Sequence, residues 1–192
     1  ALKNMLDIFG SLQIRNVATL GGNIGSASPI GDTLPLLMAC KAKLKLQSAE
    51  KTRYCYLEDF IKGYRTTDLQ PDELITEVLI PKPAKSSFIK SYKVSKRKDL
   101  DISTVSAGFS LVSVNGTVQE IILAYGGMAA QTMRAVRTER FLTGKTWSQL
   151  VVGEAMDILH HEFSPLSDAR AGADYRRDRK STRLNSSHVR LS

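Results

Sequence analysis

The spacing of apolar residues changes several times in the first part of the chain. Over residues 2–12 apolar side chains recur every three or four positions, which predicts a helix. Residues 41–48, KAKLKLQS, alternate between polar and apolar, and a period of two is typical of a strand with one solvated face. Shorter runs predict a helix over 34–39, strands over 53–56 and 74–80, and a helical turn over 57–63.

The second part of the chain has the pattern of an antiparallel sheet followed by helices. Asn115-Gly116 separates two apolar runs, and this pair fits a two-residue hairpin turn. We therefore expect an α+β protein whose second unit contains a three-stranded antiparallel sheet. The strands predicted in this unit are 88–96, 102–114 and 118–125, and its helices are 138–142 and 147–163.

The proline-containing run from Pro81 to Ser87 is the best candidate for a domain boundary. It predicts a first unit over residues 1–83 and a second over 84–178. Residues 179–192 have no apolar periodicity, so we expect them to be an unrelated tail, an artefact rather than part of a domain. The opening alanine indicates a piece of a longer protein.

Composition excludes several classes of protein. A hydrophobic content of 42% in 192 residues is typical of a globular chain, not of a disordered, collagen-like or coiled-coil one. Of the net charge of +8, five charges lie in residues 176–192, and the remainder does not interleave aromatic with basic residues, so we expect no nucleic-acid binding. No apolar segment approaches the roughly 20 residues that span a bilayer. Cys40 and Cys55 are too few for a disulfide framework, which favours reduced thiols and a cytoplasmic location.

The most informative chemistry lies in residues 14–35, a segment rich in glycine that we interpret as a long loop. Around Gly21 and Gly22 the main-chain N–H groups are not obstructed by side chains, which is how a chain cradles phosphate oxygens. Ser28 adds a hydroxyl, and Asp32, which with Thr33 is a candidate cap for the next helix, adds a carboxylate suited to ribose hydroxyls. A tight structural turn is the alternative, since neither a G-x-G-x-x-G fingerprint nor a P-loop is present.

Other candidate residues are weaker. The run from Lys93 to Asp101 contains four cations and two acids, which is typical either of a solvated loop or of a lysine that reaches an anion. His160 and His161 are adjacent on a predicted helix and therefore face different ways, so no metal site is expected. No catalytic group stands out. This favours a module that carries a cofactor.

The glycine-rich segment NVATLGGNIGSASPIGD, residues 16–32, resembles the second flavin-binding loop of the molybdenum hydroxylase flavoproteins. This group includes the xanthine dehydrogenases, the aldehyde oxidases and the medium subunit of carbon monoxide dehydrogenase. The resemblance continues in the same order through FIKGYRTTDLQPDELITEVLIP, KSYKVSKRKDLDIS and LAYGGMAAQTMRA, and it covers residues 1–177. SASPIGD is most similar to the bacterial xanthine dehydrogenase subunit that joins iron–sulfur and FAD domains.

The resemblance implies a fold and a cofactor. The fold is the C-terminal half of a vanillyl-alcohol-oxidase-type FAD domain, followed by a small sheet with helices like the C-terminal domain of the carbon monoxide dehydrogenase flavoprotein. Tyr64 and Asp99 fall beside the flavin face used by NAD, and no residue of this chain is assigned a catalytic or metal-binding role. The predicted FAD-binding residues are Phe9, Thr19, Leu20, Gly21, Gly22, Asn23, Ser28, Asp32, Ile75 and Lys93.

The resemblance also implies a role in a larger enzyme of purine catabolism. Electrons from a molybdopterin centre would pass through 2Fe-2S clusters to FAD and then to NAD, with the molybdenum and iron–sulfur domains as partners. The first flavin loop of the family, with a Gly-Asn-Thr-like pattern, is absent here, so this chain is expected to bind FAD poorly or not at all and to be inactive by itself. The alternatives are another molybdenum hydroxylase, such as an aldehyde oxidase or carbon monoxide dehydrogenase, or a flavin-free interaction domain.

Overall fold

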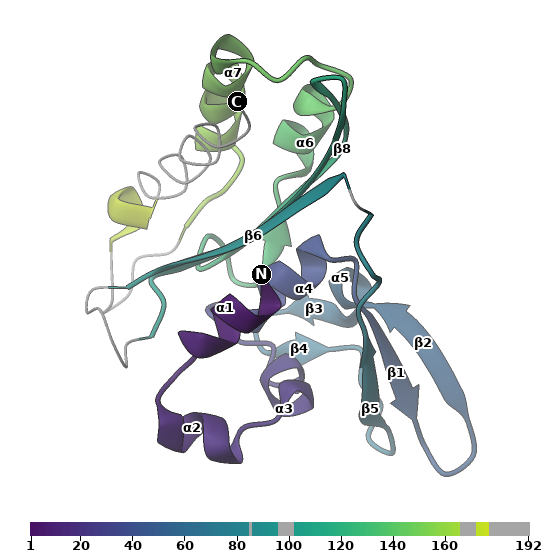
Figure 1. The fold of residues 1–192 in the computed structure, drawn as a ribbon. Coiled ribbons are helices and arrows are strands. Elements are labelled where there is room, and N and C mark those ends of the chain that lie inside the picture. Colours follow the sequence, from purple (N-terminus) through teal and green to yellow (C-terminus); the bar gives the residue numbers. More distant parts are fainter. Residues whose placement is uncertain (85, 96–101, 166–171, 177–192) are drawn as a thin grey trace.

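A computed structural model describes residues 1–84, 86–95, 102–165 and 172–176 of the chain (Figure 1). It mixes helices with antiparallel sheets, so the predicted α+β class is confirmed. The predicted tail, residues 179–192, lies outside the described residues. The helices are α1 (Leu2–Asp7), α2 (Leu12–Val17), α3 (Leu20–Gly25), α4 (Thr33–Ala39), α5 (Leu57–Phe60), α6 (Val136–Leu142) and α7 (Gln149–His160). The strands are β1 (Lys43–Gln47), β2 (Thr52–Tyr56), β3 (Ile61–Gly63), β4 (Thr66–Thr67), β5 (Leu74–Leu79), β6 (Ser87–Val94), β7 (Val105–Val114), β8 (Thr117–Gly126) and β9 (Met133–Arg134).

The first sheet follows from the alternation in β1. Its strands are ordered β2-β1-β5, and both neighbours run antiparallel to β1. Leu44 and Leu46 point into the core with no exposed surface, whereas Lys43 and Lys45 lie on the opposite face. The core beneath the sheet also contains Ile24 of α3 and several residues of α4. The sheet thus holds α3 and α4 in place through its buried face.

The second sheet is built around one hairpin. Asn115 and Gly116 have φ values of 51° and 76°, which are the positive values that a type I′ turn requires, so the predicted hairpin is confirmed. The strands of this sheet are ordered β6-β7-β8-β9 and are antiparallel throughout. The two-residue strand β9 therefore adds a fourth strand to the three that the sequence predicts. A run this short carries no periodicity by which it could be recognised.

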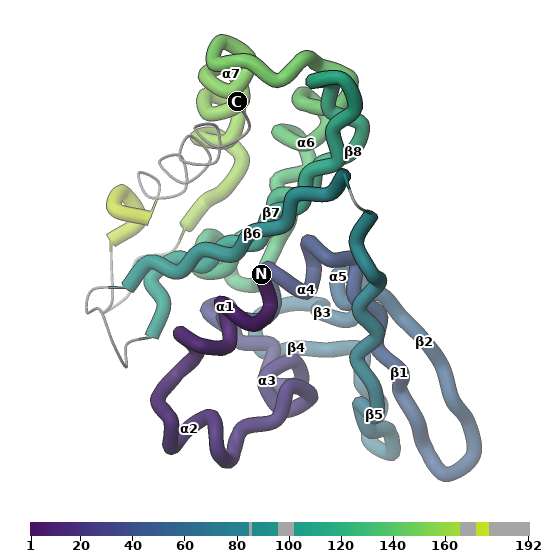
Figure 2. The backbone as a smooth tube through the Cα atoms, viewed as in Figure 1, coloured from purple at the N-terminus to yellow at the C-terminus, as the bar shows by residue number. Residues whose placement is uncertain are grey.

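Both faces of the second sheet are covered, as Figures 1 and 2 show. Helices α6 and α7 pack on one face, and α4 packs on the other against β7 and β8. Gly108 of β7 faces α4, and a Cβ atom there would lie 2.3 Å from the carbonyl oxygen of Pro35. The absence of a side chain at this position lets the backbone of α4 lie directly on the sheet.

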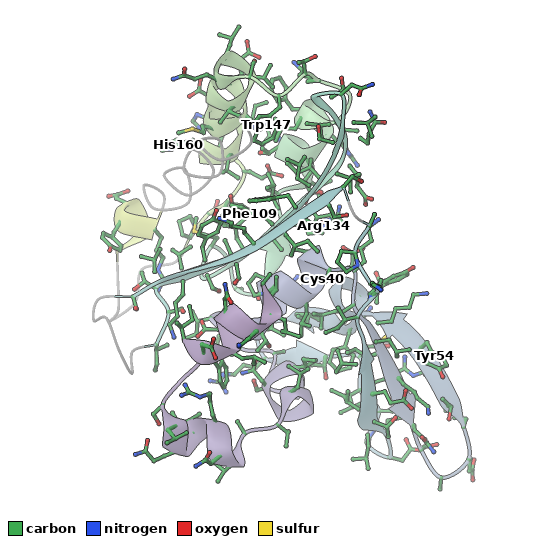
Figure 3. All side chains as sticks on the ribbon, in the orientation of Figure 1. Cys40, Tyr54, Phe109, Arg134, Trp147 and His160 are labelled. Carbon is green, nitrogen blue, oxygen red and sulfur yellow. The ribbon has the colours of Figure 1, made fainter. Side chains whose placement is uncertain are left out.

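The face under α7 is filled by aromatic residues. The ring of Tyr125 lies 5.5 Å from that of Phe109 and 5.4 Å from that of Phe163, in edge-to-face arrangements. Figure 3 labels Phe109 within this region and Tyr54 on the outer strand β2. Burial raises the pKa of the Tyr125 phenol, since the charged form would lose its hydration. Tyr125 thus serves as a core residue, and α7 contributes Val152, Ala155 and Leu159 to the same core.

Several predicted elements differ from the structure. The expected loop over residues 14–35 contains α2, α3 and the start of α4, and the helix predicted over 2–12 is broken between α1 and α2. Ser11 and Thr19 cap α2 and α3 by accepting hydrogen bonds from Ile14 N–H and Gly22 N–H. These helices have six residues each, too few to produce a recognisable period. In the described part of the chain, no helix has the length and apolarity to cross a membrane.

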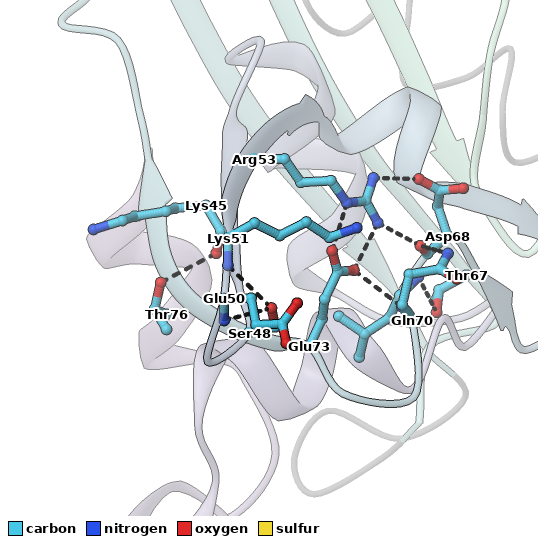
Figure 4. Close-up of polar contacts among 11 residues, drawn as sticks. Lys45, Ser48, Glu50, Lys51, Arg53, Thr67, Asp68, Gln70, Glu73 and Thr76 are labelled. Carbon is cyan, nitrogen blue, oxygen red and sulfur yellow. Dashed lines mark hydrogen bonds and ion pairs between the residues drawn. The ribbon is translucent and has the colours of Figure 1, made fainter.

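Arg53 of β2 links the first sheet to Asp68 and Glu73, which lie in the segment between β4 and β5 (Figure 4). Its guanidinium donates to both carboxylate oxygens of Glu73 at 2.7 Å and to the carboxylate of Asp68 at 2.6 Å. The main-chain N–H of Gln70 donates to Glu73 Oε2 at 3.0 Å. These donors favour the ionised carboxylate, chiefly through the Arg53 hydrogen bonds, and lower the pKa of Glu73 to about 2.

The low pKa of Glu73 makes the stability of the fold depend on pH. A carboxyl group whose pKa is lowered by folding stabilises the folded state above its unfolded pKa, near 4.5, and this contribution disappears as the pH falls towards about 2. We expect Glu73→Gln to lower the urea midpoint at pH 7 and to flatten the loss of stability between these two pH values. Glu77→Gln, which breaks an exposed pair with Lys45, is the control and should leave the wild-type pH profile. An unchanged profile in Glu73→Gln would contradict this account.

Candidate cofactor site

Asp32 and Lys93 meet where α4 begins and β6 ends. Lys93 Nζ donates to Asp32 Oδ2 at 2.8 Å and to the carbonyl oxygen of Ile8 at 3.2 Å. The other oxygen of Asp32 accepts a hydrogen bond from the Ser103 hydroxyl. The side chains of Lys93 and Asp32 are only 12% and 11% exposed. This arrangement therefore ties α1, α4, β6 and the start of β7 together at one point.

The prediction that Asp32 caps α4 is wrong in one respect. Asp32 occupies the N-cap position, but its side chain makes no capping hydrogen bond. Its φ of −65° and ψ of −28° are helical, not the extended values typical of a capping residue. The carboxylate is directed to Lys93 and Ser103 instead. The local sequence predicts the position of the residue, but a strand 61 residues further on determines its partner.

The glycine segment is the N-terminal turn of α3 and not a loop. Thr19 caps this helix: its Oγ1 accepts from Gly22 N–H at 2.9 Å and its carbonyl from Asn23 N–H at 3.0 Å. Within the described ranges, no acceptor is recorded for the N–H groups of Leu20 and Gly21, which are the first two of the helix. Two main-chain donors thus remain, fewer than the open run of amides that the sequence predicts.

The glycines of α3 have different neighbours. A Cβ on Gly21 would lie 3.6 Å from the carbonyl oxygen of Ile75, which is an ordinary contact. The structure thus brings together two of the predicted site residues, Gly21 and Ile75. A Cβ on Gly22 would lie 2.9 Å from Thr19 Oγ1 and would collide with the cap. Gly22 is also exposed. A larger residue at position 22 would therefore require the Thr19 hydroxyl to shift from its capping position.

Asn23 is connected to α4 by a side-chain hydrogen bond. The Thr33 hydroxyl donates to Asn23 Oδ1 at 2.5 Å, and Thr33 itself is 1% exposed. Thr33, which the sequence names only as a candidate helix cap, and Ser103 are therefore polar residues of the site that sequence reasoning did not assign to it. No signal could have found them, since a serine or threonine at the start of a helix or strand is common and its partner lies 10 or 71 residues away.

The remaining predicted residues lie around this centre or away from it. Phe9 is half-buried at the end of α1, beside the Ile8 carbonyl that Lys93 contacts, and Arg15 donates to its carbonyl at 2.8 Å. Ser28 lies in the turn between α3 and α4, where its carbonyl accepts from Gly31 N–H at 2.9 Å. Tyr64 lies at the tip of the β3–β4 hairpin and is 63% exposed, and no recorded contact among the described residues joins it to Asp32 or Lys93. Asp99 lies outside the described residues.

A separate hollow of about 240 Å³ lies between α4, α5 and β9. Arg134 lines it and forms ion pairs with Glu58 at 2.8 Å and Glu139 at 2.7 Å, so its charge is already balanced. None of the predicted site residues lines this hollow. The candidate site is therefore the start of α3 together with the contacts that link Asn23 through Thr33 to Asp32 and Lys93.

Comparisons with known proteins define first a class and then a family. The family model described as the FAD binding domain in molybdopterin dehydrogenase matches residues 1–83, and that of the CO dehydrogenase flavoprotein C-terminal domain matches residues 90–182. The class is therefore that of the flavoprotein regions of molybdenum-containing oxidoreductases, and the chain belongs to the FAD region of the molybdenum hydroxylases. The predicted family is thus confirmed.

Individual relatives agree with this assignment. The chain is 39% identical over 173 residues to the xanthine dehydrogenase/oxidase of Gallus gallus and 40% identical over 184 residues to a nicotinate hydroxylase of Emericella nidulans. These matches cover 88% and 92% of the chain but only 13% and 14% of those proteins. The chain therefore spans a small part of the curated relatives it matches.

Solved structures share the fold. Carbon monoxide dehydrogenase from Hydrogenophaga pseudoflava, in a form that lacks the molybdenum-pyranopterin moiety, matches with a TM-score of 0.87 and 27% identity over 93% of this chain and 62% of that one. Quinoline 2-oxidoreductase from Pseudomonas putida 86 matches with a TM-score of 0.87 and 25% identity over 98% of this chain and 65% of that one. The chain thus spans less than two thirds of either chain.

The Asp32–Lys93 pair should matter to stability because it is largely removed from water. We expect Lys93→Met to lower the free energy of unfolding by about 3 kcal/mol, since it leaves a nearly buried carboxylate without its cation. Lys45→Met, which breaks a more exposed pair on another strand, is the matched control and should cost distinctly less. Urea unfolding followed by circular dichroism measures both, and equal losses would show that the Asp32–Lys93 pair has no special weight.

Proposed function

We propose that this chain is the FAD-binding, electron-transferring portion of a xanthine dehydrogenase-like molybdenum hydroxylase. The observation that carries the proposal is the series of contacts that links Asn23 of α3 through Thr33 to Asp32 and Lys93. The main-chain N–H groups of Leu20 and Gly21 have no recorded acceptor among the described residues. Together with the side-chain amide of Asn23 and the ammonium group of Lys93, they are donors suited to a diphosphate, and an N-terminal turn of a helix favours negative charge. The absence of a side chain at Gly22 leaves the approach to these donors open.

Each residue would contribute a distinct contact. Leu20 and Gly21 would donate their N–H groups to diphosphate oxygens, and Thr19 would hold the turn that presents them. Asp32, with its carboxylate held between Lys93 and Ser103, would accept hydrogen bonds from ligand hydroxyls. Bound FAD supplies the electron-carrying chemistry, which no side chain of this chain replaces.

Further predicted residues would shape the surroundings of the cofactor. Phe9 and Ile75 would provide apolar contacts on either side of the α3 turn, and Ser28 a hydroxyl from the turn before α4. Lys93 would direct its positive charge towards an anionic part of the cofactor. Its ammonium group lies 2.8 Å from the Asp32 carboxylate. The family to which the chain belongs supports these roles.

The proposal extends to the partners of the whole enzyme. Molybdopterin and iron–sulfur domains would deliver electrons, and NAD would accept them, with Tyr64 and Asp99 on the NAD side. We further propose residues 1–83 and 84–178 as its two domains, purines as the substrate class and the cytoplasm as its location. The similarity to xanthine dehydrogenases of several organisms supports the choice of substrate class.

The proposed binding turn is tested by a substitution in α3. We expect Gly22→Val, introduced into the full-length enzyme that carries this region, to abolish flavin loading, because its side chain displaces the Thr19 cap and projects over the N-terminal turn. Gly25→Ala is the matched control, since its Cβ would meet only Ile75 Cδ1 at 3.8 Å. Flavin released on denaturation is measured by fluorescence. A full flavin content in Gly22→Val, with an unchanged Tm, would contradict the assignment.

The proposed NAD side is tested separately. We expect Tyr64→Ala to leave the flavin content unchanged and to raise the KM for NADH by about fivefold, the effect of losing one aromatic contact. Tyr54→Ala removes a similarly exposed tyrosine, 58% against 63%, from strand β2 and should leave the KM unchanged. Steady-state reduction of a dye by NADH gives both values. Equal KM values for the two variants would remove Tyr64 from the NAD site.

A further inference from the structure

The hydrogen bond between Thr33 and Asn23 determines more than the packing of two helices. A side-chain amide has one end that only accepts hydrogen bonds and one that only donates them. The Thr33 hydroxyl lies 2.5 Å from Asn23 Oδ1, so the accepting end faces α4. Nδ2, the donating end, is thereby turned away from α4, and no acceptor for it is recorded among the described residues.

The backbone of Asn23 is held independently of its side chain. Its N–H donates to the Thr19 carbonyl at 3.0 Å, and its carbonyl accepts from the Ser26 hydroxyl at 2.8 Å. The position of Cα and Cβ is therefore set by α3. The contact with Thr33 places the amide group beside α4. At that place the terminal torsion is roughly two-fold, so the amide has two orientations to choose between.

Thr33 is suited to make this choice. It is 1% exposed, so water does not compete for its hydroxyl, and it is the first residue of α4, directly after Asp32. Asp32 is itself fixed by Lys93 and Ser103. The ion pair thus fixes the start of α4, and α4 in turn fixes the hydroxyl that orients Asn23.

We propose that Thr33 is a positioning residue that turns the Nδ2 group of Asn23 towards the ligand and so makes the site selective for anionic oxygens. This inference rests on the proposed FAD-binding function. In the opposite orientation Oδ1 would face the diphosphate, and two acceptors would repel each other. Thr33 touches no ligand in this scheme and acts only through Asn23.

The test is a double-mutant cycle on the affinity of the full-length apoenzyme for FAD. Thr33→Val keeps the shape of the side chain but removes its hydroxyl, and we expect the Kd for FAD to rise by about tenfold, the effect of losing a hydrogen bond to a charged group. Thr33→Ser keeps the hydroxyl and should bind within about twofold of the wild type. Asn23→Ala should weaken binding at least as much as Thr33→Val, and the double variant no more than Asn23→Ala alone.

The outcomes separate this inference from the proposed function. If Asn23→Ala weakens binding but Thr33→Val does not, Thr33 has no positioning role and the FAD site stands. If Thr33→Val weakens binding equally with and without Asn23, or if Thr33→Ser is as impaired as Thr33→Val, the effect is structural and the inference is overturned. If the wild type does not bind FAD, or Asn23→Ala retains full affinity, this assignment of the diphosphate site fails, and the inference fails with it.

Discussion

The close contact between α4 and the second sheet is the constraint on which the candidate site depends. The backbone of Pro35 lies against Gly108 so tightly that no larger residue fits without a shift of the helix. The same contact is continued by Ala124 of β8, which belongs to the core formed by α3, α4 and the first sheet. Because β7 is paired with β6, this docking also determines where Lys93 lies relative to Asp32. The position of the site therefore follows from how α4 packs on a sheet that lies far from it in the sequence.

The polar groups of the site stabilise one another in pairs. Lys93 and Ser103 occupy the two oxygens of Asp32, and Thr33 occupies the oxygen of Asn23. Buried or nearly buried polar groups require partners, and here the partners come from β6, α4 and the segment that precedes β7. The start of α3 adds two main-chain N–H groups for which no acceptor is recorded among the described residues, and these are the donors that we propose for the cofactor.

The family assignment and the geometry contribute different parts of the account. The two matched family models cover residues 1–83 and 90–182, so they define the class of the whole chain. They do not say how Asn23 is oriented or what holds Asp32. Those details come from the side-chain contacts, and they concern residues that the sequence resemblance does not single out, namely Thr33 and Ser103.

The sequence by itself determined the elements with strong local signals. The alternation in β1, the Asn115-Gly116 hairpin and the long strands around it are set by neighbouring residues, and the glycine segment with its Thr19 cap is local as well. The short helices α2 and α3, strand β9 and the partners of Asp32 were decided only by the tertiary structure. Six-residue helices have no readable period, and a hydrogen bond across 61 or 71 residues depends on the docking of α4 on the sheet, which no local pattern encodes.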